Sequence, residues 1–571
     1  MRKKRVLLVL AGVLLLLMSL GACTSEDPTA TPTATSAPEV PSAPASTPTP
    51  APTSTPVPTP TPLPQTGTAV DYPIECPKRG GQLVMGNAKE ITNPTPFIAS
   101  SVDHYVKASS MFEPLVALAK DGTIQGVLAS SWEANEDNSE WTFTLREGVK
   151  FHDGTEMTAA DVVWSALYVT NPANAATGQA DLAQVEDVVA DDDYTVRFIL
   201  SGPAPLFLLQ IESPSALPVV KANSMEDGVV QVEVPPPGTG PFQFAEWVPA
   251  DKLEVTKFAD YWAGEPCVDG VTYKLISSTS ARQNALRAGD VHLIERAGPE
   301  FVQRVESGEI EGIEASAATL SGFRMFNLNV ANEPLDDIKL REAVITGMDM
   351  QALLDEAFLG SGYLIDGQVP LDSAWHQVLL DCCPHIAYDP ERAKALASEA
   401  GYDGEELTLI VERGQGEPIG ESLERSLRLA GFNIELVVLE SGVYDERQAS
   451  GDFHITPNSE GWGGDGFFGL QRWLCEPGLP EFSISNHGRL CIDEFDAIME
   501  SQSSVADLEE RLALYFDARK LVYDAMANKY MGKQFTRFFA WGAHVEGFDH
   551  IGNGAYVDYL GHGLPYIWLD E

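Results

Sequence analysis

The chain has 571 residues, of which 44% are hydrophobic, so it is long enough to form several folding units around sizeable cores. It carries 83 acidic residues against 37 lysines and arginines, and its formal net charge is −46. A chain this acidic lacks the basic face that binds nucleic acid or anionic lipid, so we expect neither kind of partner.

The first 22 residues have the pattern of a signal peptide. Residues 2–5 are all basic, and residues 6–20 form an apolar run that is short for a membrane span. The run closes in Leu-Gly-Ala followed by Cys23, which resembles the lipobox of bacterial lipoproteins. We therefore expect cleavage before Cys23, lipidation of this cysteine and a position at the extracytoplasmic face of the bacterial cell membrane. An ordinary secretory signal is the alternative.

Residues 23–69 have the composition of a linker, because they are rich in Pro, Thr, Ala and Ser and nearly free of large apolar residues. Such a segment cannot bury enough surface to offset its chain entropy. Frequent proline favours an extended spacer with a rise of ~3.1 Å per residue. A glycosylated stalk is a compatible interpretation.

The remaining cysteines suit an oxidising compartment, where an even number indicates disulfides. Cys475 and Cys491 would close a short loop and are the pair that we expect to bond. Cys382 and Cys383 are adjacent, and we expect strain to keep them from bonding each other. No spacing of cysteine or histidine indicates a metal site, and we expect no cofactor.

Helix and strand signals alternate after residue 80. Residues 141–145 alternate as a half-buried strand, which 148–151 would continue after a turn, and 407–411 and 434–439 have the pattern of strands. Thr158 would cap a helix with Asp161 at its third position. Asp389 and Pro390 would begin another helix, which Gly401 would end. This alternation predicts an α/β fold with mixed sheets.

Three segments resemble catalytic or ligand-binding motifs, but each lacks a feature that such a motif requires. His152 and Asp153 lie in a predicted turn, and no helix opens after the glycines at 238–240 to make a dinucleotide loop. The acidic run at 191–193 lacks the glycine and the distant glutamate of a calcium loop. We therefore expect no enzymatic activity.

Several stretches, in order along the chain, resemble the extracytoplasmic solute-binding proteins of ABC transporters, in the dipeptide- and oligopeptide-binding group (family 5). They include Gly-Thr-Gly-Pro-Phe at 238–242, Tyr-Asp-Pro-Glu-Arg-Ala at 388–393 and Gly-Trp-Gly-Gly-Asp at 461–465. The other matching stretches are 113–115, 128–133, 141–146, 148–154, 158–165, 261–264, 285–290, 326–329, 340–343, 399–402 and 495–496.

The resemblance implies a two-lobed periplasmic-binding-protein fold with mixed sheets, a hinge, and an extra domain inserted in the first lobe. Mapped onto this chain, lobe I would comprise residues 78–112, 236–318 and 535–571. The inserted domain would comprise 113–235 and lobe II 319–534. Ligand would be captured between the lobes by hinge closure.

The resemblance also implies which residues touch a peptide. Relatives bind the α-amine through an Asp in a Trp-x-x-Asp turn, which matches Asp465 here, with Trp462, Gly463 and Gly464 in the same turn. The chain then departs from the common Asp-Pro continuation and reads Gly-Phe-Phe-Gly, which predicts a more aromatic wall. Other candidates for ligand contact are Ser100, Ser101 and Val102 in lobe I, Asn327 at the hinge or cleft, and Trp541 through stacking.

The leading hypothesis is a monomeric, membrane-tethered binding protein that delivers peptides to the permease of an ABC importer. The ligand could instead be an oligosaccharide, a nickel chelate or another small solute, since the family varies its ligand on one scaffold. A secreted hydrolase on a stalk would need a catalytic set at a cleft, and none stands out. A structural or adhesive surface protein would not become more compact with ligand, whereas a binder would.

Overall fold

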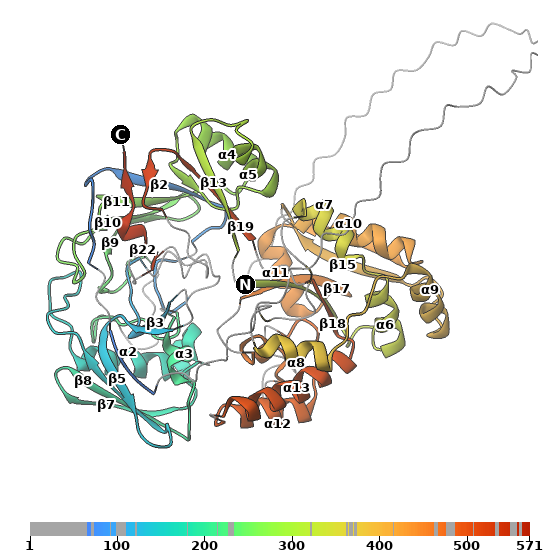
Figure 1. Ribbon diagram of the computed structural model, residues 1–571, viewed down its shortest axis with the longest axis horizontal. Coiled ribbons are helices and arrows are strands. Elements are labelled where there is room, and N and C mark those ends of the chain that lie inside the picture. The colour runs from blue at the N-terminus through green and yellow to red at the C-terminus, as the bar shows by residue number, and fades with distance from the viewer. Residues whose placement is uncertain are drawn as a thin grey trace, which may run out of the picture. The chain divides into compact units, whose positions relative to one another are not determined.

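The structure of the protein is a computed structural model (Figure 1). The residues it describes are 65–69, 73–91, 93–98, 110–119, 123–179, 181–213, 215–225, 233–319, 322–360, 364, 369, 374–414, 416–461, 466–475, 486–505, 507–531, 536–548, 557–558 and 562–570.

Three large sheets organise these residues. The inserted-domain sheet is antiparallel and has the order β1-β5-β6-β8-β7. Alternation places one face inward, as in β8, where Val196, Phe198 and Leu200 are buried. The elements of this part are β1 (Thr66–Thr68), β3 (Val116–Leu118), β4 (Ile124–Gly126), β5 (Ala129–Ala134), β6 (Glu140–Leu145), α2 (Ala159–Thr170), η1 (Pro172–Asn174), η2 (Thr177–Gln179), β7 (Val185–Asp192), β8 (Thr195–Leu200) and α3 (Phe207–Ile211).

The lobe I sheet is mixed, with the order β13-β19-β12-β2-β11-β10-β9. Its centre is parallel, because β2 runs in the same direction as both β11 and β12. Its elements are β2 (Gln82–Asn87), β9 (Phe242–Val248), β10 (Lys252–Lys257), β11 (Gly270–Leu275), α4 (Thr279–Ala288), β12 (Leu293–Ile294), α5 (Pro299–Glu306), β13 (Ile313–Thr319) and β19 (Thr536–Gly542). Short elements near the C-terminus are β20 (Val545–Glu546), β21 (Val557–Asp558), β22 (His562–Gly563), η4 (Leu564–Tyr566) and β23 (Trp568–Leu569).

The lobe II sheet has the order β16-β15-β17-β14-β18, with β15 parallel to both neighbours. Helices cover it on two sides, since Phe326 packs with one group of helices and its neighbour Met325 with another (Figure 1). Its elements are β14 (Gly322–Leu328), α6 (Ile338–Thr346), α7 (Met350–Phe358), α8 (Ala374–Cys382), α9 (Pro390–Glu399), β15 (Glu406–Glu412), α10 (Gly416–Leu429), β16 (Asn433–Leu439), α11 (Ser441–Ser450), β17 (Ile455–Gly461), η3 (Phe468–Trp473), α12 (Asp493–Gln502), α13 (Leu508–Asp524) and β18 (Asn528–Met531).

Two pairs of consecutive strands connect the lobes. β13 belongs to lobe I and β14 to lobe II, while β18 belongs to lobe II and β19 to lobe I. Within each lobe, the two strands that lead to the other lobe pair with each other: β13 pairs with β19 in lobe I, and β14 pairs with β18 in lobe II. An antiparallel pair that passes from one sheet to the other is the hinge of this two-lobed fold.

The inserted domain and lobe I share one hydrophobic core. Trp141 and Phe198 of the inserted-domain sheet belong to the same buried cluster as Leu83 and Met85 of β2. Lobe II has separate clusters, of which the largest surrounds Phe326. The inserted domain is therefore packed onto lobe I as one body.

A buried carboxylate joins the two parts of that body. Glu113 is fully buried and accepts hydrogen bonds from the Tyr261 hydroxyl at 2.7 Å and the Trp262 indole at 3.1 Å. Burial raises the pKa of Glu113 to about 7, although the hydrogen bonds from Tyr261, Thr239 and Trp262 act in the opposite direction. The Arg146 guanidinium stacks 4.3 Å above the Trp262 ring. Two of the matching stretches, at 113–115 and 261–264, thus meet in one structural network.

His152 also has a structural environment. Its Nδ1 accepts from the Gly238 N–H at 3.3 Å, and its Nε2 lies 3.0 Å from the Gly240 carbonyl oxygen. Burial lowers the pKa of His152 to about 4. The neighbouring Asp153 bonds Thr155 and Lys221, so the two side chains do not form a catalytic pair. A Cβ on Gly238 would lie 2.1 Å from the Met111 carbonyl oxygen, which explains the glycine there.

Most of the local predictions agree with the structure. The Asp161 carboxylate accepts from the Thr158 N–H at 2.8 Å at the start of α2. Asp389 caps α9 by accepting from the Arg392 N–H at 2.9 Å, and Gly401 follows with a φ of +82°. The strands expected at 141–145, 407–411 and 434–439 are β6, β15 and β16.

Three expectations were wrong. Residues 148–151 follow β6 after a turn, as expected, but they form no strand and make only a bridge between Lys150 and Glu156. Thr66–Thr68, expected in the linker, pairs as β1 with the edge of β5. The adjacent cysteines at 382 and 383 are bonded to each other at the end of α8, buried among the helices of lobe II.

Two further disulfides are present, one between distant segments and one across a short loop. Cys76 is bonded to Cys267, 191 residues away. Cys475 is bonded to Cys491, which is the pair that we expected from their short separation.

Candidate functional site

The carboxyl ends of the parallel strands mark the candidate site. In lobe I these are the ends of β2, β11 and β12, and in lobe II those of β15, β16 and β17. Ligands of open α/β sheets bind outside the carboxyl ends of the strands. Lys89 follows β2, and its Nζ lies 3.3 Å from Oε1 of Glu412, the last residue of β15. The carboxyl edges of the two lobes therefore meet.

A second carboxylate of lobe II lies near this ion pair. Burial raises the pKa of Asp445 on α11, Lys89 lowers it and Glu412 raises it. Lys89 of lobe I thus faces two acidic groups of lobe II. This arrangement favours contact between the lobes.

Arg324 places a guanidinium group at the same edge. It lies on β14, is half-buried, and its Cζ stands 5.9 Å from the centre of the Phe358 ring. Burial lowers the pKa of Arg324 to about 10. Tyr444 and Glu412 raise it, and Arg296 of lobe I lowers it further. Charged groups from both lobes are therefore close enough to influence one another.

The backbone around Arg296 is fixed by a buried arginine. Arg282 on α4 is 1% exposed and donates to the carbonyl oxygens of Glu295 and Arg296, each at 3.2 Å. The Glu295 carboxylate accepts from the Ala88 N–H at 2.9 Å, which ties this turn to the segment carrying Lys89. Lys89 and Arg296 are thus held in place by one set of hydrogen bonds.

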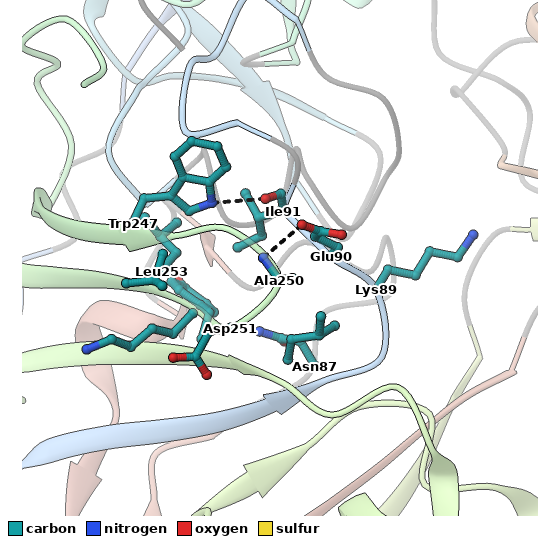
Figure 2. Close-up of a pocket in the computed structure, with 12 residues that line it drawn as sticks. Asn87, Lys89, Glu90, Ile91, Trp247, Ala250, Asp251 and Leu253 are labelled. Atoms are coloured by element: carbon teal, nitrogen blue, oxygen red, sulfur yellow. Dashed lines mark hydrogen bonds between the residues drawn. The ribbon is translucent and has the colours of Figure 1, made fainter. Parts of the chain in front are cut away.

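The segment after β2 also borders a hollow of about 210 Å³ in lobe I, part of it open to solvent. The Trp247 indole donates to the Ile91 carbonyl oxygen at 3.0 Å, and the Ala250 N–H to Glu90 at 2.8 Å (Figure 2). Figure 2 shows the Lys89 side chain extending away from Trp247. The two hydrogen bonds hold the backbone of this segment in place, and the Lys89 side chain extends away from Trp247 to pair with Glu412.

Most of the ligand-binding residues predicted from the sequence lie outside the described residues. These residues are Asp465, Trp462, Gly463, Gly464, Ser100, Ser101 and Val102. The lipidation candidate Cys23 also lies outside the described residues. The turn at 462–465 follows directly after Gly461, the last residue of β17. It is therefore joined to a strand whose carboxyl end belongs to the candidate site.

The two other predicted site residues, Trp541 and Asn327, lie within the described part of the chain. Trp541 is 7% exposed, packs edge-to-face against Phe548 at 4.9 Å and donates its indole N–H to Glu314 at 3.2 Å. Asn327 is 1% exposed in the middle of β14, where it pairs with Thr456 and Asn528 rather than ending a strand. Ligand contact by either residue stays a prediction.

The sequence reasoning missed Lys89, Arg296, Arg324 and Glu412. One signal was available for Arg324, which interrupts the apolar pattern of Gly322–Leu328. Glu412 likewise ends an apolar strand. Charged residues at the ends of apolar strands could have indicated the carboxyl edge.

In the part of the chain that the structure describes, no group of three or more His, Cys, Asp and Glu is placed to hold a metal ion. Nor does any helix within that part have the length and apolar character needed to span a bilayer.

Comparison with known proteins agrees with this architecture. The glutathione-binding protein GsiB of Pectobacterium atrosepticum is 28% identical over 363 residues, which are 63% of this chain and 69% of that protein. The dipeptide-binding protein of Escherichia coli K12 is 26% identical over 473 residues, 77% of this chain and 85% of that protein.

Solved structures show the same fold. A dipeptide-binding protein from Pseudoalteromonas in complex with Met-Leu matches with a TM-score of 0.76 at 20% identity, over 86% of this chain and 100% of that one. NikZ from Campylobacter jejuni in complex with Ni(L-His) matches with a TM-score of 0.73 at 19% identity, over 82% and 95%. The family described as bacterial extracellular solute-binding proteins, family 5, matches residues 123–472. The chain therefore belongs to the bacterial extracellular solute-binding proteins of family 5.

Proposed function

We propose that this protein captures peptides between its two lobes and delivers them to the permease of an ABC importer. The observation that carries the proposal is the meeting of the carboxyl edges of both lobes at Lys89 and Glu412. Relatives with named ligands support the peptide class, since they include a dipeptide-binding protein and a glutathione-binding protein. The protein would act as a monomer and without catalysis.

Within this proposal, Asp465 binds the α-amine of the peptide. Its turn follows β17, so its position in the sequence is that of a carboxyl-edge loop. A charge-assisted hydrogen bond to a buried carboxylate is strong, and removing one partner costs about 2–5 kcal/mol. Asp465→Ala should therefore abolish measurable peptide binding, whereas Asp355→Ala on α7 should not.

The lobe boundaries form part of the proposal. We assign 78–112, 236–318 and 535–571 to lobe I, 113–235 to the inserted domain and 319–534 to lobe II. Residues 66–68 are added to the inserted domain, since β1 pairs with β5. The preceding linker would tether the protein to the outer face of the cell membrane through lipid on Cys23. Cys23→Ala should release the protein from the membrane fraction.

Native mass spectrometry of the gently purified full chain tests the ligand class. A series of released peptide masses would support the proposal. A single non-peptide mass would replace the peptide by another solute, as in the neighbours that hold Ni(L-His) or agropinic acid. Failure of every released mass to rebind the emptied protein would contradict a binding function.

A further inference from the structure

A buried tryptophan of lobe II packs against the residue that directly follows Asp465. Trp375 is the second residue of α8, is 5% exposed, and belongs to a core cluster that also contains residues of α12 and α13. Gly466 is buried as well. A Cβ on Gly466 would lie 2.5 Å from Cε3 and 2.7 Å from Cδ2 of the Trp375 ring. The large ring and the missing side chain are therefore complementary in size.

Phe467 holds the next residue of the chain in the same cluster. The rings of Trp375, Phe467 and Tyr515 meet edge to face in all three pairs. Their centroids are 5.9 Å apart for Trp375 and Phe467, 5.6 Å for Phe467 and Tyr515, and 5.1 Å for Trp375 and Tyr515. Aromatic pairs favour this geometry over face-to-face stacking. Since all three side chains are at most 5% exposed, the segment after Asp465 begins inside the core of lobe II.

A buried cation joins these rings to the helices around them. Cζ of Arg511 on α13 lies 5.2 Å from the centre of the Phe467 ring and 5.8 Å from that of the Trp375 ring. A guanidinium group near an aromatic face is attracted by the ring. Nη1 of Arg511 donates to the carbonyl oxygen of Gln502, the last residue of α12, at 2.7 Å. Helix α8 lies beside α13 in Figure 1, so three helices of lobe II fix the position of the rings.

The two ends of the turn at 462–465 are thus anchored by different contacts. Gly461 ends β17 and pairs in register with Gly322 of β14. Gly466 and Phe467 are held by the aromatic cluster. Four residues join these anchors, so a displacement of Gly466 must be taken up within them. A group that contacts a ligand in a defined geometry binds best when the surrounding packing holds it in place.

We propose that Trp375 and Gly466 are positioning residues for Asp465. The Trp375 ring determines where the backbone lies after Asp465, and the absence of a side chain on Gly466 lets the ring reach it. Neither residue contacts the ligand in this assignment. It rests on the proposed function, in which Asp465 binds the α-amine of a peptide, and it adds the packing that orients this carboxylate.

The test compares peptides that differ only at the amine. Pools of two- to five-residue peptides, with a free or an acetylated N-terminus, are offered to the full chain emptied of ligand. Calorimetry then measures the Kd of the best-binding sequence in both forms. Gly466→Ala should bind the free-amine form about tenfold more weakly, because the added Cβ displaces the backbone beside Asp465. It should bind the acetylated form as the parent does.

A matched control and a milder variant accompany this change. Gly202→Ala lies in the inserted domain, has nothing within 4 Å of its Cβ, and should bind both forms as the parent does. Trp375→Phe keeps a ring but leaves space beside Gly466, and should weaken binding of the free-amine form about threefold. It provides the same comparison if Gly466→Ala does not fold. Thermal unfolding shows which variants are folded.

Two double variants separate positioning from loss of stability. Trp375→Val removes the ring atoms that oppose the added methyl group, so Gly466→Ala with Trp375→Val should bind the free-amine form more tightly than Gly466→Ala alone. Two independent defects would add instead. In an Asp465→Ala background, Gly466→Ala should have no further effect on either form, since both changes act on the same contact.

The outcomes also separate this inference from the proposed function. If the parent prefers the free amine and Gly466→Ala keeps that preference, or weakens both forms alike, the positioning assignment is wrong and peptide capture stands. A double variant with Trp375→Val that binds no more tightly than Gly466→Ala alone would also overturn it. If the parent binds both forms equally, the role of Asp465 fails and this assignment fails with it. If the parent binds no peptide, the proposed function itself is wrong.

Discussion

Replacement of Lys89 by methionine removes the ion pair that joins the lobes and should weaken ligand binding. At 3.3 Å the attraction between unit charges is about 1.3 kcal/mol in water and about 5 kcal/mol at an effective dielectric constant of 20. The two side chains are 31% and 30% exposed, so solvent screening and side-chain ordering reduce the net contribution to about 1 kcal/mol. That energy corresponds to about a fivefold rise in Kd.

The rise should appear mainly in the dissociation rate, because the pair forms only when the lobes meet. Calorimetry and stopped-flow displacement on the full chain measure both quantities, and small-angle scattering reports compaction on ligand addition. Lys394→Met is a matched control, since Lys394 pairs with Glu391 at 2.6 Å on the exposed face of α9. Salt should reduce the difference between the parent and Lys89→Met. Equal affinities for Lys89→Met and Lys394→Met at low salt would refute the reasoning.

Three further predictions concern stability. Burial in the folded state raises the pKa of Glu113 from 4.5 to about 7, so the folded protein holds this proton more tightly than the unfolded chain does. The contribution of Glu113 to the free energy of unfolding should therefore fall by on the order of 3 kcal/mol as the pH rises from 4.5 to 7. Glu113→Gln should flatten this part of the pH profile in urea unfolding, and an unchanged slope would contradict the burial argument. Gly238→Ala should lower the Tm or prevent folding, because its Cβ would meet the Met111 carbonyl oxygen at 2.1 Å. Gly442→Ala, with nothing within 4 Å, should raise the Tm slightly, and similar shifts in the two variants would count against the steric explanation. Replacing Cys76 and Cys267 by serine should cost about 2–5 kcal/mol, since their bond closes a loop of 191 residues, and an unchanged denaturant midpoint would show that the bond does not constrain the unfolded chain.

Local signals were sufficient for the helix starts and for most of the strands. The start of α9 follows from Asp389 and Pro390, since a side chain caps the helix and the proline occupies a position without a required N–H. The family resemblance supplied the two-lobed arrangement, which no local pattern could have given. Its motifs at 113–115 and 261–264 became explicable only when the structure brought Glu113 to Trp262.

The interlobe contacts could not be predicted in the same way. Lys89 and Glu412 are far apart in the sequence, and their meeting depends on the strand order of two sheets and on the hinge between them. The surroundings of Trp541 depend on tertiary contacts in the same way. An aromatic residue on a late strand can line a cleft or pack in a core, and its contacts with Phe548 and Glu314 could not be read from the sequence.

The Cys382–Cys383 bond shows a limit of another kind. Strain was a reason to exclude it, yet the two residues are bonded at the end of α8, where Cys382 is the last helical residue and both are buried. Disulfides usually join residues whose Cα atoms are about 4.4–6.8 Å apart, whereas the Cα atoms of these neighbours are 3.8 Å apart. For neighbouring cysteines this usual range gave the wrong answer here.

The docking of β1 determines where a pull on the N-terminal segment would act. Ala134 N–H bonds the Gln65 carbonyl oxygen, and Gly67 lies against the Trp132 ring, so the segment is held along the edge of β5. Tension would load these contacts in shear and pass into the inserted domain, which shares its core with lobe I. The inserted domain and lobe I would then be the stationary half of the molecule, and lobe II the half that swings.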